Sequence, residues 1–206
     1  DLDNQVRVRF TNIDKVTTFM DKCRRMGIEL LGPDINESHL KFNVNQEGNI
    51  RFGLSAIKGV GDSAAEKIIE ERNQNGVYRD IYDFVERVNL HAVNKKSIES
   101  LATAGAFDNL SRLNRAQFFA QTGNEMNVIE SLIKYGNKYQ NDKQGQQQTL
   151  FGDSVGVEIA KPKIPEVEEW QKLDKLNKEK ELVGIYLSAH PLDDFKAEVE
   201  HFTNTN

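Results

Sequence analysis

The chain has 206 residues, of which 38% are hydrophobic and 29% are charged, and its formal net charge is −5. This length allows one large or two small hydrophobic cores. The negative net charge argues against a surface coated with basic residues for nucleic-acid binding, but it allows a local site that holds phosphate through backbone amides.

The cysteine and histidine content limits the chemistry. The single cysteine, Cys23, excludes an internal disulfide bond and is typical of a reducing compartment. Four scattered histidines and one cysteine have no metal-ligand spacing, and no apolar run approaches the length of a membrane span. We therefore expect a cytoplasmic protein with no metal site, no cofactor and no membrane partner.

The N-terminal quarter mixes one helix with short strands. Apolar residues recur at helical spacing over residues 12–25, which predicts a helix. Residues 28–31 are predicted to form a short strand that stops before a Gly-Pro pair. The alternating residues 40–44 are expected to pair with residues 50–52 as a β-hairpin.

From residue 53 to about residue 121 the pattern is helical in short pieces. Asp80 and Asn94 stand where N-caps are expected, Asp83 is placed to return a capping bond, and Gly105 can close a helix. The predicted helices cover residues 54–58, 62–73, 80–88, 94–105 and 113–121. The fold class is therefore mainly α, with a small β-hairpin.

The C-terminal part is more polar. A helix is predicted over residues 125–135, but residues 136–148 are mostly Asn, Gln, Lys and Gly, a composition that favours a linker. A charged helix that buries Trp170 is predicted over residues 166–180. A last helix is expected from Pro191, with Leu192, Phe195, Val199 and Phe202 facing inward.

One short motif carries a chemical prediction. Gly59-Val60-Gly61 lies between two predicted helices, and glycine allows a tight turn with an uncovered backbone. The amides of the hairpin and of the next helix start would then face outward as an anion site, reinforced by the helix dipole. Val60 would plug the space between the helices. The predicted phosphate-binding residues are Lys58, Gly59, Val60, Gly61, Asp62 and Ser63.

A second helical pair follows from Asp80 to Gly105, and paired helix-hairpin-helix motifs act together on a duplex. Lys95 and Lys96, at the start of its second helix, occupy the equivalent phosphate-facing place. The second hairpin, residues 89–93, has no Gly-x-Gly, which leaves its amide site in doubt. We predict a tandem helix-hairpin-helix domain with flanking helical connectors.

Blocks of residues across nearly the whole chain resemble the bacterial DNA polymerase III alpha subunit, a C-family replicative polymerase. They are Met26 to Ile28, Gly32 to Ser38, Ile50 to Leu54, Ile57 to Gly61, Asn94 to Lys96, Ala104 to Asp108 and Leu182 to Leu192. The resemblance implies distal fingers over residues 1–38, a β-hairpin over 39–53, a tandem helix-hairpin-helix DNA-binding domain over 54–122, a helix and glutamine-rich linker over 123–165, and a helical connector over 166–206 toward an oligonucleotide-binding domain.

The same resemblance implies what the longer protein does. It would synthesise DNA on a template with Mg²⁺ bound outside this part, alongside other replicative holoenzyme subunits. This part would hold duplex DNA without reading its sequence. Gln147, Leu150 and Phe151 resemble the short peptide by which such polymerases hold the sliding clamp, and adjacent apolar anchors in a polar segment suit a partner's pocket.

Other interpretations compete with this one. The hairpin could merely pack, in a protein-interaction module that binds no DNA. A DNA repair glycosylase also carries a helix-hairpin-helix, but it needs a catalytic aspartate beside a pocket for a flipped base. Capping explains Asp80 and Asp83. Asp1 and Asp3 look like paired metal-binding carboxylates, but no third carboxylate can be placed with them, so we predict no catalytic residue.

Overall fold

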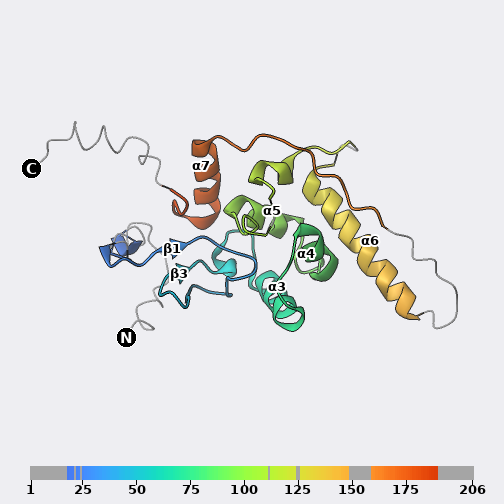
Figure 1. The fold of residues 1–206 in the computed structure, drawn as a ribbon, viewed down its shortest axis with the longest axis horizontal. Helices are drawn as coiled ribbons and strands as arrows, with labels where there is room; N and C mark the ends of the chain where they lie inside the picture. Colours follow the sequence, from blue (N-terminus) through green and yellow to red (C-terminus); the bar gives the residue numbers. More distant parts are fainter. Residues whose placement is uncertain are drawn as a thin grey trace, which may run out of the picture.

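Helices dominate the computed structural model (Figure 1). It describes residues 18–189 except 21, 24, 111, 124, 125 and 149–158, and the side chains of all of these except 144 and 146–148. The helices are α3 (Asp62–Asn75), α4 (Ile81–Arg87), α5 (Lys95–Ala104), α6 (Val128–Gln148) and α7 (Lys172–Val183), with the 3-10 turns η1 (Leu54–Ala56) and η2 (Arg115–Phe119). The predicted mainly α fold is confirmed.

A small sheet precedes the helices. Its strands β1 (Leu30–Leu31), β2 (Asn43–Val44) and β3 (Ile50–Arg51) lie in the order β1-β3-β2. The predicted hairpin is the antiparallel pair of β2 and β3, whereas β1 joins β3 in parallel. Residues 18–20, 22, 23 and 25 are helical, so the described end of the predicted first helix is present. The earlier part of that helix, residues 12–17, and the helix predicted from Pro191 lie outside the described residues.

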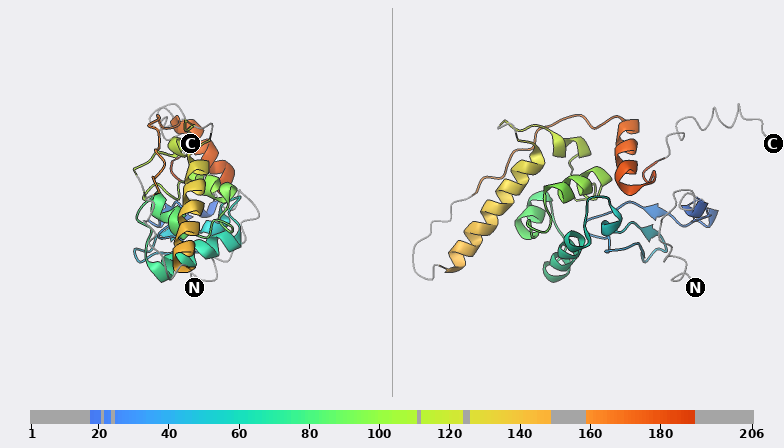
Figure 2. Two further views of the ribbon diagram at one scale, coloured as in Figure 1. Left: turned by 90° about the vertical axis from the view of Figure 1, so that its right-hand side faces the viewer. Right: turned by 180° about the vertical axis from the view of Figure 1, so that it is seen from behind.

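The core is formed by side chains of α3, α4, α5 and α6 and of the segments between them. Phe84 of α4 meets Phe107 edge to face with ring centroids 5.1 Å apart, and Phe107 stacks on Phe118 of η2 at 5.5 Å. Such aromatic pairs add to the stabilisation that area burial provides. Figure 2 shows α6 along one side of this bundle and α7 over the opposite end.

The predicted linker over residues 136–148 is wrong, because these residues form the second half of α6. Gly136 lies so close to α4 that a Cβ there would be 2.5 Å from the Val85 carbonyl oxygen. The Gln140 amide donates to the carbonyls of Val85 and Val88, each at 2.9 Å. These carbonyls at the end of α4 have no partner within that helix. A polar sequence is thus held by hydrogen bonds, and its Gln and Lys residues favour helix.

The charged helix begins later than predicted, at Lys172 instead of residue 166. Residues 159–171 instead run extended from α6 back to α7 (Figure 1). Side chains of the bundle hold this segment by its carbonyls: Gln117 donates to Pro165 and Asn114 to Val167. A backbone whose carbonyls bind elsewhere does not close helical hydrogen bonds.

Gln140→Ala should lower the free energy of unfolding by about 1–3 kcal/mol, because two buried carbonyls of α4 lose their donor. The matched control, Lys143→Ala in the exposed end of α6, should change it by less than about 0.5 kcal/mol. Urea denaturation measures both. Equal small effects would mean that residues 136–148 behave as the linker that their composition predicts.

Candidate nucleic-acid interface

The first hairpin connects η1 to α3, and most of its residues are exposed. Ile57 and Val60 are buried, and the Val60 amide donates to the Ile57 carbonyl at 3.0 Å, which closes the turn. Val60 therefore has the position expected of the plug between helices. Lys58, Gly59, Gly61, Asp62 and Ser63 around it are all exposed.

The two glycines of this hairpin have different roles. Gly59 has φ +92°, and a Cβ there would lie 2.4 Å from the Ser100 hydroxyl of α5. The Ser97 hydroxyl also donates to the Gly59 carbonyl at 3.3 Å. Gly61 has φ −74° and ψ 157°, and a Cβ there would meet nothing within 4 Å. Gly59 thus allows close packing on α5, whereas Gly61 leaves the start of α3 open.

The start of α3 has the features of an anion site. Gly61 is its N-cap and supplies no side-chain cap hydrogen bond. The first-turn amides of a helix have no helical partner and carry the positive end of its dipole. Asp62 places a negative charge in the same turn, which favours the helix but opposes a bound phosphate. The site is therefore suited to weak backbone contact.

The second hairpin differs because its own side chains occupy its amides. The Asn89 carboxamide oxygen accepts from the His91 and Ala92 amides at 3.0 and 3.2 Å. At the start of α5, Asn94 accepts from the Ser97 amide at 3.1 Å. The second hairpin lacks a Gly-x-Gly motif, and its amides already have acceptors within the protein. They are therefore not available to a phosphate.

Lys95 and Lys96 are directed differently. The Lys95 ammonium lies 2.7 Å from Glu130 of α6 and 3.7 Å from Glu99. The hydrogen bond to Glu130 is the largest effect that raises the pKa of Lys95. The Lys96 Cε instead lies 3.7 Å from the position that a Cβ would take on Gly59. The second helical pair thus brings one lysine, Lys96, beside the first hairpin.

The aspartates relevant to the glycosylase interpretation are structural. Asp80 caps α4 by accepting from the Asp83 amide at 2.8 Å. Asp83 returns a bond to the amide of Arg79, one residue before the N-cap, and pairs with the Arg79 and Arg87 side chains. Burial alone would raise the pKa of Asp83, but these hydrogen bonds outweigh it and lower the pKa.

The described residues lack the features of two other classes of protein. They contain no group of three or more His, Cys, Asp or Glu side chains that could hold a metal ion. None of their helices has the length and apolar character needed to cross a bilayer. Of the predicted clamp-binding residues, Gln147 lies in the last turn of α6, while Leu150 and Phe151, like Asp1 and Asp3, lie outside the described residues.

The chain is similar to proteins of known family. A model of the helix-hairpin-helix motif matches residues 27–118. The DNA polymerase III alpha subunit of Caulobacter vibrioides is 39% identical over 89% of the chain, that of Vibrio cholerae 35% over 94%, and that of Escherichia coli 33% over 93%. This chain corresponds to one segment of a bacterial DNA polymerase III alpha subunit. The segment spans about 15% of the length of these relatives, and its predicted helix-hairpin-helix fold is confirmed.

Gly59→Ala should cost about 2 kcal/mol or more of folding free energy, because alanine resists this positive φ and its methyl meets Ser100. Gly61→Ala, in an ordinary conformation and open space, should cost less than about 1 kcal/mol. Thermal and urea unfolding of the two variants test this difference. Equal losses would show that the hairpin does not pack on α5 through Gly59.

Proposed function

We propose that the segment binds duplex DNA through its sugar-phosphate backbone, without reading base sequence, within a replicative DNA polymerase. The observation that carries the proposal is the exposed start of α3, where Gly61 leaves the first-turn amides without a side-chain cap. The relatives, which are named as polymerase subunits, and the matching motif support it.

The chemistry of the contact follows from the hairpin. A phosphate oxygen would accept from the amides at Gly61, Asp62 and Ser63, while the nearby Lys58 and Lys96 would add positive charge. Val60 is buried and would support the turn from beneath. Amide contacts to phosphate position a duplex but carry no sequence information. The binding is therefore weak, sensitive to salt and indifferent to sequence.

Gly61→Asn tests this contact directly. Asn94 caps α5 with φ −75° and ψ 175°, and these angles are close to those of Gly61 at the start of α3. The new side chain should cap α3, leave stability unchanged or raise it by a few tenths of a kcal/mol, and weaken duplex binding several-fold by occupying the amides. Fluorescence anisotropy with two unrelated duplexes measures the affinity.

Gly32→Asn is the control, because a Cβ at Gly32 also meets nothing within 4 Å and the position is away from the hairpin. For the unmodified segment, the slope of log affinity against log salt should be about −2 to −3, as expected for two or three neutralised phosphates. Undiminished binding by a stably folded Gly61→Asn variant would favour the alternative in which the hairpin only packs.

The activity of the whole polymerase belongs to the same proposal. The longer protein would join deoxynucleotides on a template using Mg²⁺ bound outside this segment, together with other holoenzyme subunits. The described residues would bind the backbone of the product duplex. Weak backbone contact suits this role because the duplex must slide past the hairpin after each addition.

We further propose that the peptide Gln147 to Phe151 tethers the polymerase to the sliding clamp. Leu150 and Phe151 are adjacent large apolar residues in a polar stretch, and such anchors commonly dominate binding to a partner's pocket. The support for this part is the sequence pattern and its position at the C-terminal end of α6, where Gln147 lies in the last turn.

The double change Leu150→Ala and Phe151→Ala separates tethering from packing. If the peptide binds a bacterial sliding clamp, the change should abolish binding, since such anchors often contribute about 2 kcal/mol or more each, while the melting temperature stays within about 1 °C. Calorimetric titration of the clamp into both proteins measures this. A lower melting temperature, or no heat with the unmodified chain at high clamp concentration, would reject the tether.

A further inference from the structure

One carboxylate in α7 joins segments that are far apart in the sequence. Glu179 is 1% exposed and accepts from the Arg115 guanidinium at 2.9 Å. It also accepts from the amides of Leu187 and Ser188, at 3.0 and 2.9 Å, and from the Ser188 hydroxyl. A buried carboxylate with this many donors fixes both α7 and the chain that follows it.

Arg115, the partner of Glu179, is itself held firmly. It is 4% exposed, pairs with Asp108 at 2.7 Å and donates to the Thr103 carbonyl at 3.1 Å. The guanidinium lies across Gly105, where a Cβ would approach to 2.1 Å. Glu179 is therefore bound to a cation anchored at the end of α5, not to a mobile surface side chain.

The same helix contacts the first hairpin, the proposed phosphate-binding hairpin of residues 57–61, about one turn after Glu179. The Lys58 amide donates to the Leu182 carbonyl at 2.9 Å. Leu182 is in the last turn of α7, where carbonyls have no partner within the helix. Lys58 directly precedes Gly59, so this bond fixes the backbone at the entrance to the hairpin.

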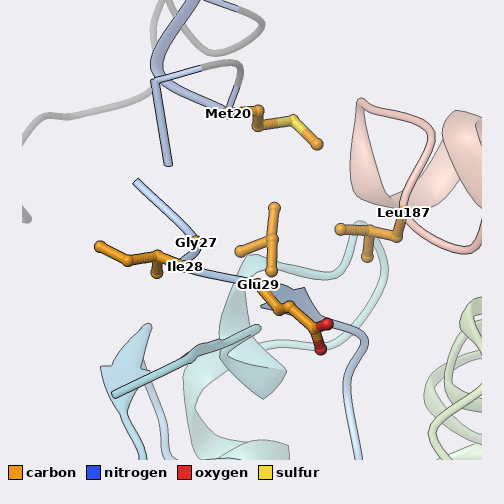
Figure 3. A pocket seen from close by; sticks show the side chains of 6 residues that line it. Met20, Gly27, Ile28, Glu29 and Leu187 are labelled. Atoms are coloured by element: carbon orange, nitrogen blue, oxygen red, sulfur yellow. The ribbon is translucent and has the colours of Figure 1, made fainter. Parts of the chain in front are cut away.

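Beyond α7 the anchored chain reaches the N-terminal sheet. Leu187 forms one wall of a pocket of about 400 Å³, opposite Met20 and Ile28, with Glu29 at its edge (Figure 3). The Glu179 carboxylate holds the amide of this same Leu187. Glu179 thus fixes α7 at one buried point. From there, the Leu182 carbonyl contacts the hairpin, and Leu187 lies beside the β1 region.

We propose that Glu179 is a positioning residue for the phosphate-binding hairpin. By fixing α7 against Arg115, it holds the Leu182 carbonyl where the Lys58 amide must meet it, and so sets the direction in which the amides of Gly61 to Ser63 point. Glu179 is buried, so it would act on DNA binding only through the hairpin. The proposal rests on the proposed function for its effect on affinity, but the link from Glu179 to Lys58 stands independently of DNA.

Hydrogen exchange of the whole chain, followed by NMR, tests the link without DNA. In the unmodified protein the amides of Lys58, Leu187 and Ser188 should be protected to a similar degree, because one opening of α7 exposes all three. In Glu179→Gln, which removes the charge but keeps the size, the Lys58 amide should exchange at least about tenfold faster. Unchanged Lys58 exchange in a folded Glu179→Gln variant would overturn the proposal.

A pair of glycine variants keeps the test valid even if Glu179→Gln fails to fold. Gly184 ends α7 with φ +85° and Gly76 ends α3 with φ +84°, and a Cβ meets nothing within 4 Å at either. Alanine strains both helix ends, but only Gly184→Ala disturbs the turn that carries Leu182. It should weaken duplex binding about fivefold, the equivalent of one hydrogen bond, and speed Lys58 exchange, while Gly76→Ala should do neither.

The outcomes separate the two proposals. If the unmodified chain binds no duplex, the proposed function fails, and the Lys58 exchange rates still decide whether Glu179 positions the hairpin. If the duplex binds and Gly184→Ala weakens binding no more than Gly76→Ala does, Glu179 and α7 have only a structural role and the inference is wrong.

Discussion

The position of α7 against the helical bundle depends on one buried ion cluster, centred on the Arg115 guanidinium. A charge removed from water is tolerated only when its hydrogen bonds and counter-charges are complete. Burial lowers the pKa of Arg115, but the hydrogen bonds and charges of Asp108 and Glu179 outweigh it and raise the pKa. Removing one partner from such a cluster typically costs about 3–5 kcal/mol. The end of α5, η2 and α7 are therefore held in one relative position.

The two hairpins differ in what accepts from the amides at the start of the helix that follows each of them. Each precedes a helix whose first-turn amides need acceptors. In the second hairpin, Asn94 accepts from the first-turn amide of Ser97 in α5, and Asn89 accepts from the loop amides of His91 and Ala92. The first hairpin has glycine at the corresponding cap, Gly61, and no side-chain acceptor there. The tandem repeat thus combines a stable support with an open contact.

The sequence predicted features that depend on local chemistry. The caps at Asp80 and Asn94, the αL glycine at Gly105 and the buried Val60 follow from neighbouring residues, and the structure has each of them. The longer α6 was missed because its second half is held by donors to α4, which composition cannot reveal. The pairing of Lys95 with Glu130, 35 residues away, was missed for the same reason.

The extended run before α7 is a further case of non-local control. Trp170 was expected inside a helix, but its ring lies against Phe119, and Glu169 accepts from the backbone amides at the start of η2. Burial alone would raise the pKa of Glu169, but its hydrogen bonds, with Lys175 the strongest, lower it. A glutamate that caps another segment cannot be told from one on a charged helix by spacing alone.

The close approach of Gly59 to α5 has a mechanical consequence. With only a glycine between the hairpin backbone and Ser100, the two elements meet as rigid surfaces that no flexible side chain separates. A methyl group added at this point would push the hairpin, and the start of α3 that follows it, away from α5. Because α3 is a rod about 21 Å long, even a small tilt at its start would be magnified at its far end. The absence of a Cβ at Gly59 thus allows the hairpin backbone to lie directly against α5.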